Sequence, residues 1–105
     1  MSKRLAMLEG MIAKGTKDPF AWYALAMEYA GLDRIDDALG TYEKLREIDA
    51  TYVPQYLMCG QMLAKAGRVD EARSWMEQGI ERARAKGDGH AMSELESALG
   101  GLGSS

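Results

Sequence analysis

The sequence is poor in the residues that build disulfide-linked, metal-binding and turn-rich proteins. It has one cysteine, one histidine and two prolines among 105 residues. A single cysteine excludes an intrachain disulfide, and one histidine with one cysteine cannot supply the usual ligands of a zinc site. The sequence has neither an apolar run long enough to span a bilayer nor a signal-peptide pattern at its start. These absences favour a cytoplasmic protein that carries neither cofactor nor metal.

The composition is that of a folded domain rather than a disordered chain. Apolar residues make up 47% and charged residues 28% of the sequence, and the formal net charge is −3. Because the chain has no basic cluster, we expect neither nucleic acid nor a membrane as a partner. The length suits one domain, which we place at residues 1–99, followed by a flexible tail at 100–105.

Residues 19–52 and 53–86 resemble each other at a constant offset of 34 residues. Similarity at such a fixed period is typical of helical repeat proteins. The identical pairs are Ala30 and Ala64, Arg34 and Arg68, Asp36 and Asp70, Ala38 and Ala72, Glu43 and Glu77, and Glu47 and Glu81. We therefore treat residues 19–52 as repeat 1 and residues 53–86 as repeat 2.

Each repeat divides into two helical patterns separated by a turn, which predicts an antiparallel helix hairpin. In repeat 1, apolar residues such as Trp22 and Leu25 recur at helical spacing on one face. Asp18 is expected to cap this first helix, with Pro19 at its first position, where the missing N–H of proline costs nothing. Asp33 is the expected cap of the second helix.

Three further helix positions follow from the same reasoning. The first helix of repeat 2 is expected to begin near Thr51 or Tyr52, because Pro54 is tolerated only near a helix start. Single helices at 2–14 and 88–99 each match half a repeat and would cap the two ends of the stack. The sequence therefore predicts an all-α chain of about six helices with no sheet.

Specific residue types occupy fixed positions of both repeats. They are Trp22, Leu25, Ala26, Tyr29, Ala38 and Tyr42 in repeat 1, and Tyr56, Cys59, Gly60, Leu63, Ala72 and Met76 in repeat 2. This pattern resembles the tetratricopeptide repeat family, and in particular its small bacterial-type proteins. It departs at Ala50 and Arg84, where the family usually has proline. The resemblance implies an α-solenoid of antiparallel hairpins, with a concave surface that binds peptides and no catalytic activity.

The first helix of repeat 1 is apolar on two sides, although its hairpin can cover only one of them. Phe20, Tyr23 and Met27 form the second stripe, and the resemblance implies that this stripe and its equivalents line the concave groove. The expected groove residues are Phe20, Tyr23, Met27, Ala30, Pro54, Leu57, Met58, Gln61, Lys65, Met92 and Leu95. Methionine and aromatic surfaces suit an apolar peptide or an amphipathic helix, so the expected partner is another protein.

Two alternatives for this stripe stay open: it could be covered by a second copy of the chain in a homodimer, or buried within one copy. A third role is not expected. Some family members grip the terminal carboxylate of a chaperone tail with basic groove side chains. The corresponding positions here hold no basic residue: Tyr23, Met27, Met58, Asp88 and Met92. We expect no such carboxylate clamp.

Residues that could carry catalysis have simpler structural roles. His90 is expected to pack or cap at the start of the last helix, and Cys59 is expected in the core, where a thiol is inert. Acidic pairs recur at one repeat position near helix starts, where they complement the helix dipole. These pairs are Asp36 with Asp37 and Asp70 with Glu71. We therefore expect no enzyme activity.

Overall fold

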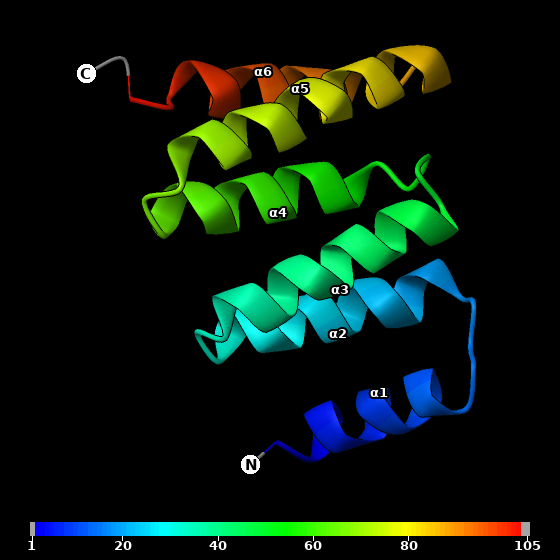
Figure 1. Ribbon diagram of the computed structural model, residues 1–105. Helices are drawn as coiled ribbons and strands as arrows, with labels where there is room; N and C mark the ends of the chain where they lie inside the picture. The colour runs from blue at the N-terminus through cyan, green and yellow to red at the C-terminus, as the bar shows by residue number, and fades with distance from the viewer. Residues whose placement is uncertain (1, 104–105) are drawn as a thin grey trace. The chain divides into compact units, whose positions relative to one another are not determined.

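The segments whose apolar residues recur at helical spacing are α-helices in the computed structural model, which describes residues 2–103 (Figure 1). Six helices and no strands occur across that range, which confirms the predicted all-α class. They are α1 (Lys3–Ala13), α2 (Pro19–Gly31), α3 (Ile35–Ile48), α4 (Pro54–Lys65), α5 (Val69–Lys86) and α6 (Gly89–Gly100).

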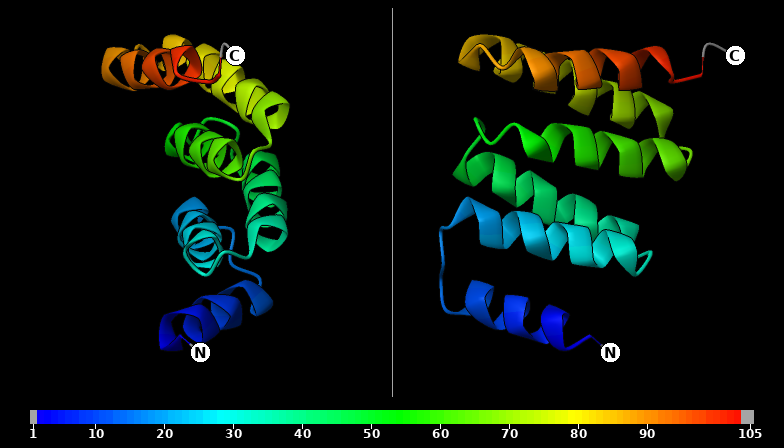
Figure 2. Two further views of the ribbon diagram at one scale, coloured as in Figure 1. Left: turned by 90° about the vertical axis from the view of Figure 1, so that its left-hand side faces the viewer. Right: turned by 180° about the vertical axis from the view of Figure 1, so that it is seen from behind.

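The helices belong to two compact units, unit 1 (Met1–Tyr52) and unit 2 (Val53–Ser105). Within unit 1, α2 and α3 form an antiparallel hairpin, and α1 packs against α2 (Figure 2). Within unit 2, α4 and α5 form the equivalent hairpin, and α6 contacts both of them. The division between the units falls where repeat 1 meets repeat 2.

The predicted helix starts are confirmed at Asp18 and corrected at α4. The Asp18 carboxylate accepts a hydrogen bond from the Phe20 N–H at 3.0 Å, and Pro19 is the first residue of α2. The prediction that α4 begins near Thr51 or Tyr52 was wrong by two or three residues, since α4 begins at Pro54 itself. Proline is favoured at that first position, because its fixed φ suits a helix and its N–H is not needed there.

A residue with left-handed backbone follows the end of each of four helices, α1, α2, α4 and α5, by one or two positions. The residues are Gly15, Asp33, Gly67 and Gly87, with φ of 90°, 60°, 82° and 71°. The turns after α2 and α4 have matching hydrogen bonds: the Arg34 N–H donates to the Tyr29 carbonyl, and the Arg68 N–H to the Leu63 carbonyl. This is the usual helix-ending motif, in which the left-handed residue follows the last helical turn. The prediction of Asp33 as a helix cap was therefore wrong: it closes α2, and Arg34 precedes α3.

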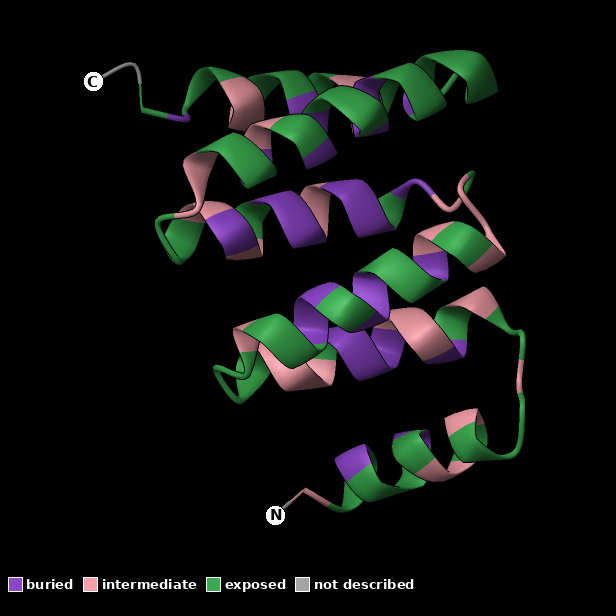
Figure 3. Cartoon of the chain, viewed as in Figure 1, coloured by how far each residue is buried: buried purple, intermediate pink, exposed green. Residues whose placement is uncertain are grey.

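Small residues let the helices of each hairpin approach closely, as their positions predicted. In unit 1, Ala26 and Ala38 are fully buried. In unit 2, a β-carbon on Gly60 would lie 2.7 Å from Met76 Cγ, and Cys59 is buried beside it, as expected. Figure 3 shows in purple the buried residues along α2 and α4. The acidic pairs also lie as expected, in the first turns of α3 and α5.

The C-terminal end is more ordered than the sequence suggested. The residues at 100–102 were predicted to be part of a flexible tail, but α6 continues to Gly100 and Leu102 is only 7% exposed. The Leu102 N–H also donates to the Leu99 carbonyl at 3.1 Å. An apolar side chain that packs on unit 2 holds this segment, so the prediction was wrong there. Ser104 and Ser105, also assigned to the tail, lie outside the described residues.

Candidate functional site

The second apolar stripe of α2 stays open in unit 1. Phe20 is 60% exposed and Met27 is 38% exposed, while Tyr23 is half-buried. Among the described residues, the large apolar side chains that remain exposed all belong to unit 1: Met7, Met11, Phe20, Met27 and Leu32. Contiguous apolar surface on a folded protein commonly marks an interaction site. Phe20 and Met27 of this stripe are therefore exposed, although α1 and α3 both pack on α2.

A pocket of about 210 Å³ lies on this stripe, between α1 and α2. Its lining residues are Arg4, Phe20, Tyr23, Ala24, Met27 and Glu28. Ala24 is buried, and it forms a cluster with Leu5 and Leu8 of α1. We refer to this feature as the α1–α2 pocket. Arg4 and Glu28 were not predicted, because helical periodicity marks apolar stripes and does not show which residues of α1 lie beside α2.

The charged residues of the α1–α2 pocket pair with each other. The Ser2 hydroxyl donates to Glu28 Oε1 at 2.9 Å, and Arg4 Nε lies 3.5 Å from Glu28 Oε2. The side chain of Glu28 is about one quarter exposed, and the side chain of Arg4 is more than half exposed. The carboxylate therefore has both a hydrogen-bond donor and an opposite charge at the pocket.

Two tyrosine rings extend the site beside the pocket. The rings of Tyr23 and Tyr52 are tilted by 58°, with centroids 5.3 Å apart, a favourable aromatic arrangement. Burial raises the pKa of Tyr23, and Tyr52 adds to that shift. Burial also raises the pKa of Tyr52, with a further contribution from the Asp18 carboxylate. Tyr52 was not predicted, because it follows α3 in a loop, where helical periodicity gives no signal.

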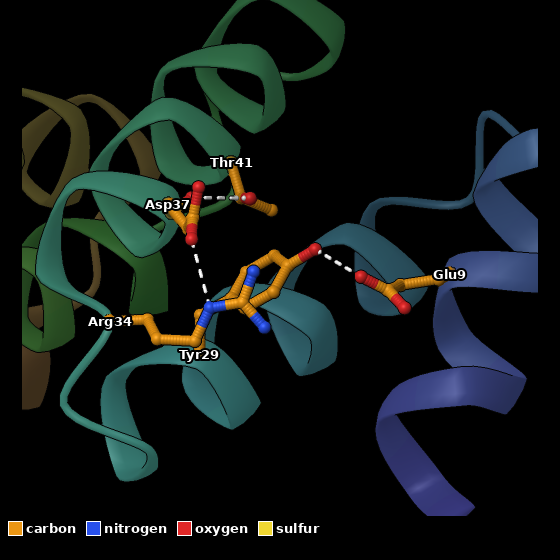
Figure 4. Close-up of polar contacts among 5 residues, drawn as sticks. All are labelled: Glu9, Tyr29, Arg34, Asp37 and Thr41. Atoms are coloured by element: carbon orange, nitrogen blue, oxygen red, sulfur yellow. Dashed lines mark hydrogen bonds and ion pairs between the residues drawn. The ribbon is translucent and has the colours of Figure 1, made fainter. Parts of the chain in front are cut away.

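A polar network on another part of α2 fastens α1 to it (Figure 4). The Tyr29 hydroxyl donates to Glu9 Oε2 at 2.6 Å, and this hydrogen bond is the main reason that the pKa of Tyr29 is raised. The Arg34 guanidinium lies 4.6 Å from the centre of the same ring, in cation–π geometry, and Arg34 Nε contacts Asp37 Oδ2 at 2.9 Å. The Tyr29–Glu9 hydrogen bond and the buried leucines of α1 join α1 to α2, the two helices that line the α1–α2 pocket.

Unit 2 carries a separate and more polar groove between α4 and α6. Its volume is about 430 Å³, and its lining residues are Leu57, Gln61, His90, Ser93, Glu94, Ser97 and Ala98. We refer to it as the α4–α6 groove. His90 Nε2 lies 3.3 Å from Glu94 Oε1, and the His90 side chain is 86% exposed. The prediction of a packing or capping role for His90 was therefore wrong, because the Asp88 carboxylate caps α6 by accepting the Ala91 N–H.

The predicted groove residues divide between the two units and only some of them lie together. Phe20, Tyr23 and Met27 line the α1–α2 pocket, and Leu57 and Gln61 line the α4–α6 groove. The others lie outside the residues that line these two sites. Of these other residues, Pro54 and Lys65 are exposed, and Ala30, Met58 and Met92 are half-buried.

The assignment of Leu95 to the groove was wrong, because its side chain is fully buried. Its Cδ2 atom lies 3.0 Å from the position that a β-carbon on Gly79 would take, so it packs closely on α5. The repeat positions that are apolar in α2 and α4 hold His90, Ser93, Glu94 and Ser97 in α6. Since those residues are polar, α6 buries its remaining apolar side, and Leu95 with it.

Two further observations bear on function. Within residues 2–103, no group of three or more His, Cys, Asp and Glu side chains is placed to hold a metal ion. Over the same part of the chain, each helix is too short or too polar to cross a bilayer.

Comparison with known proteins identifies relatives of the same architecture. The crystal structure of a tetratricopeptide repeat domain protein from Salinibacter ruber is 39% identical, with a TM-score of 0.72, and the match covers 82% of this chain and 100% of that one. A solution structure of such a protein from the same organism is 40% identical, with a TM-score of 0.73 and coverage of 78% and 83%.

A solution structure of a protein from Bordetella parapertussis is 29% identical, with a TM-score of 0.82 and coverage of 97% and 89%. The family model described as tetratricopeptide repeat matches residues 55–78, which lie in α4 and α5. No curated protein sequence matches the chain at a significant level. The repeat pattern, the six helices and these relatives agree, and the chain belongs to the tetratricopeptide repeat family.

Proposed function

We propose that this chain is a non-catalytic protein-interaction module, which binds an apolar peptide or the apolar face of an amphipathic helix on α2. The observation that carries the proposal is the exposure of Phe20 and Met27 in a folded unit where both α1 and α3 already pack on α2. The family supports the coarser statement, since the tetratricopeptide repeat fold is in general a scaffold that binds other proteins.

The physical chemistry of the α2 face suits such a partner. Methionine is flexible and aromatic rings are broad, so Met27, Phe20 and Tyr23 can adapt to apolar side chains of different shapes. Burying about 400 Å² of apolar surface would contribute on the order of 10 kcal/mol before the costs of association. After association costs of at least about 4 kcal/mol, a surface of this size supports a weak complex, with a dissociation constant on the order of tens of micromolar or higher.

The α4–α6 groove extends the proposal to polar contacts in unit 2. Gln61, Ser93 and Ser97 offer hydrogen-bonding groups, and Leu57 offers an apolar one. A partner that engages this groove would present polar side chains to it. A cytoplasmic location, and a partner that is neither nucleic acid, nor membrane, nor a carboxylate-clamped chaperone tail, are parts of the same proposal.

A pair of matched substitutions tests the proposed function. Met27→Lys places a charge on the α2 face, and Leu32→Lys places the same charge on an exposed apolar residue outside the α1–α2 pocket lining. We expect capture of the native partner from source cells to be lost with Met27→Lys and kept with Leu32→Lys, with unchanged helicity by circular dichroism in both. Equal capture by both variants would remove the α2 face from the proposal.

Self-association is a second candidate, favoured by the concentration of exposed apolar side chains in unit 1. In that case Phe20 and Met27 would be covered by another copy of the chain. Light scattering at about 100 μM, well above a micromolar dissociation constant, distinguishes the two candidates. A dimer that Met27→Lys dissociates would support self-association, and a monomeric mass would remove it.

A further inference from the structure

We infer that the α1–α2 pocket selects one bulky, uncharged side chain of the partner, and that α1 takes part in this selection through Arg4. This inference rests on the proposed function, because it names the chemical class of the partner at the same site. Three observations carry it: the size of the pocket, the balance of its charges and the helix from which Arg4 comes.

The volume suits one large side chain. At about 210 Å³ the pocket has the volume of roughly seven water molecules at ~30 Å³ each, which leaves room for one large side chain. Phe20, Tyr23, Ala24 and Met27 supply an apolar lining. A leucine, methionine or phenylalanine of the partner would therefore replace water against apolar surface, which is favourable.

The charges of the pocket cancel, and this sets the selectivity. Its charged lining residues are Arg4 and Glu28, of opposite sign and 3.5 Å apart, with the Ser2 hydroxyl donating to the same carboxylate. A charged side chain that enters loses part of its hydration and meets no net opposite charge, so its entry is unfavourable. An uncharged side chain loses much less hydration free energy when it enters the pocket. The paired charges therefore disfavour the binding of lysine, arginine, aspartate and glutamate side chains in the pocket.

Arg4 gives α1 a role beyond covering the end of a repeat stack. The helix is held on α2 by Leu5 and Leu8 in the apolar cluster and by the Tyr29–Glu9 hydrogen bond. These contacts place Arg4 beside Glu28, a residue of α2. Without Arg4, the pocket would carry the uncompensated charge of Glu28 and would favour cations.

The test uses three small probes that differ in side-chain charge. They are the Nα-acetyl α-amides of phenylalanine, lysine and glutamate, whose side chains are neutral, positive and negative. Binding is measured by NMR on the full chain, from the shift of the Met27 methyl signal. For the unmodified chain we expect the phenylalanine probe to bind about tenfold more tightly than either charged probe. Arg4→Met should improve the lysine probe at least about threefold relative to the glutamate probe, and Glu28→Gln should reverse that order.

Two controls separate selection from structural damage. Arg4→Lys keeps the positive charge and should keep the preference for the phenylalanine probe, whereas loss of α1 docking would weaken all probes equally. Arg84→Met removes the partner of Glu81 in unit 2 and should change nothing at Met27. The Tyr29 ring signals report whether α1 stays docked in each variant.

Probe affinities that are insensitive to both pocket substitutions would overturn the inference about charge balance. Failure of every probe to shift the Met27 signal, up to about 50 mM, would overturn the pocket as a side-chain site. Neither result decides the proposed function, which depends on capture of the native partner by the Met27→Lys and Leu32→Lys variants. The two claims can therefore fail separately.

Discussion

Asp33 and Gly67 occupy the same position of the two repeats, and both have left-handed backbone, with φ of 60° and 82°. Each closes the first helix of its hairpin through the same pair of hydrogen bonds, those made by its own N–H and by the N–H of the following arginine. The geometry of the turn is therefore conserved between the repeats, although only one of them uses glycine. An aspartate tolerates this conformation better than most residues, but still at a cost.

We predict that Asp33→Gly raises the free energy of unfolding by about 0.5–1 kcal/mol, because glycine adopts positive φ without a clash of its side chain. Gly67→Ala, which puts a β-carbon into the equivalent turn, should lower it by about 1 kcal/mol. Urea unfolding followed by circular dichroism measures both changes. A loss of stability in Asp33→Gly would show that the aspartate side chain contributes more than its backbone costs.

A second prediction concerns the contact of three helices in unit 2. A β-carbon on Gly79 of α5 would lie 2.5 Å from Tyr56 Cβ of α4 and 3.0 Å from Leu95 Cδ2 of α6. Gly79→Ala should therefore force the helices apart and lower the free energy of unfolding by about 1–3 kcal/mol.

Gly40→Ala is the matched control for Gly79→Ala. Gly40 is exposed in α3, and within the described chain no atom outside its own helix turn lies within 4 Å of the added carbon. Its replacement should raise the free energy of unfolding by about 0.5–1 kcal/mol, since alanine favours the helix. If both alanine variants were stabilised, the close packing at Gly79 would be disproved.

Leu95 and Leu57 provide a third prediction, because the sequence placed both in the groove and the structure separates them. Leu95 is fully buried, so Leu95→Ala should lower the free energy of unfolding by about 2–5 kcal/mol. Leu57 lines the α4–α6 groove and is half-buried, so Leu57→Ala should cost about 1 kcal/mol or less. Thermal unfolding compares them directly, and equal losses would contradict the assignment of Leu95 to the core.

A fourth prediction concerns pH. The hydrogen bond to Glu9 favours the neutral Tyr29 phenol and raises its pKa, so it stabilises the docking of α1 fully below a pH of about 10, the ordinary tyrosine pKa. That stability should be lost as the pH rises through the raised pKa, where a phenolate would face the Glu9 carboxylate. Glu9→Ala should move the Tyr29 pKa back towards its ordinary value, measured by NMR of the ring carbons. The Tyr23 and Tyr52 titrations serve as internal controls and should not move.

The sequence predicted the hairpins well because their signals are local. Asp18 and Pro19 mark the start of α2 through capping and backbone chemistry that act within one turn. Ala26, Ala38 and Gly60 mark close helix contacts, because only small residues fit there. The exposure of Phe20 and Met27 followed from the same local reasoning, since one hairpin can cover only one side of α2.

The errors arose where contacts between elements decide the outcome. Leu95 has the repeat position of a groove residue. In α6, however, the polar side that includes Ser93 and Ser97 faces solvent, and the side that carries Leu95 is buried. Aspartate is a common residue type at a helix N-cap, but Asp33 instead takes the left-handed position that the turn after α2 requires. Arg4 joins the site only because α1 docks beside Glu28, a contact that periodicity does not encode.

Site-specific photo-crosslinking in cells would show whether the α2 face engages another polypeptide. A benzophenone amino acid is placed at position 20, replacing Phe20, or at position 40, replacing the exposed Gly40 of α3, and the cells are irradiated. We predict a crosslink to a different polypeptide from position 20, absent from position 40 and abolished by adding Met27→Lys. Crosslinks of equal yield from both positions, or none from position 20, would show that the α2 face engages no specific partner.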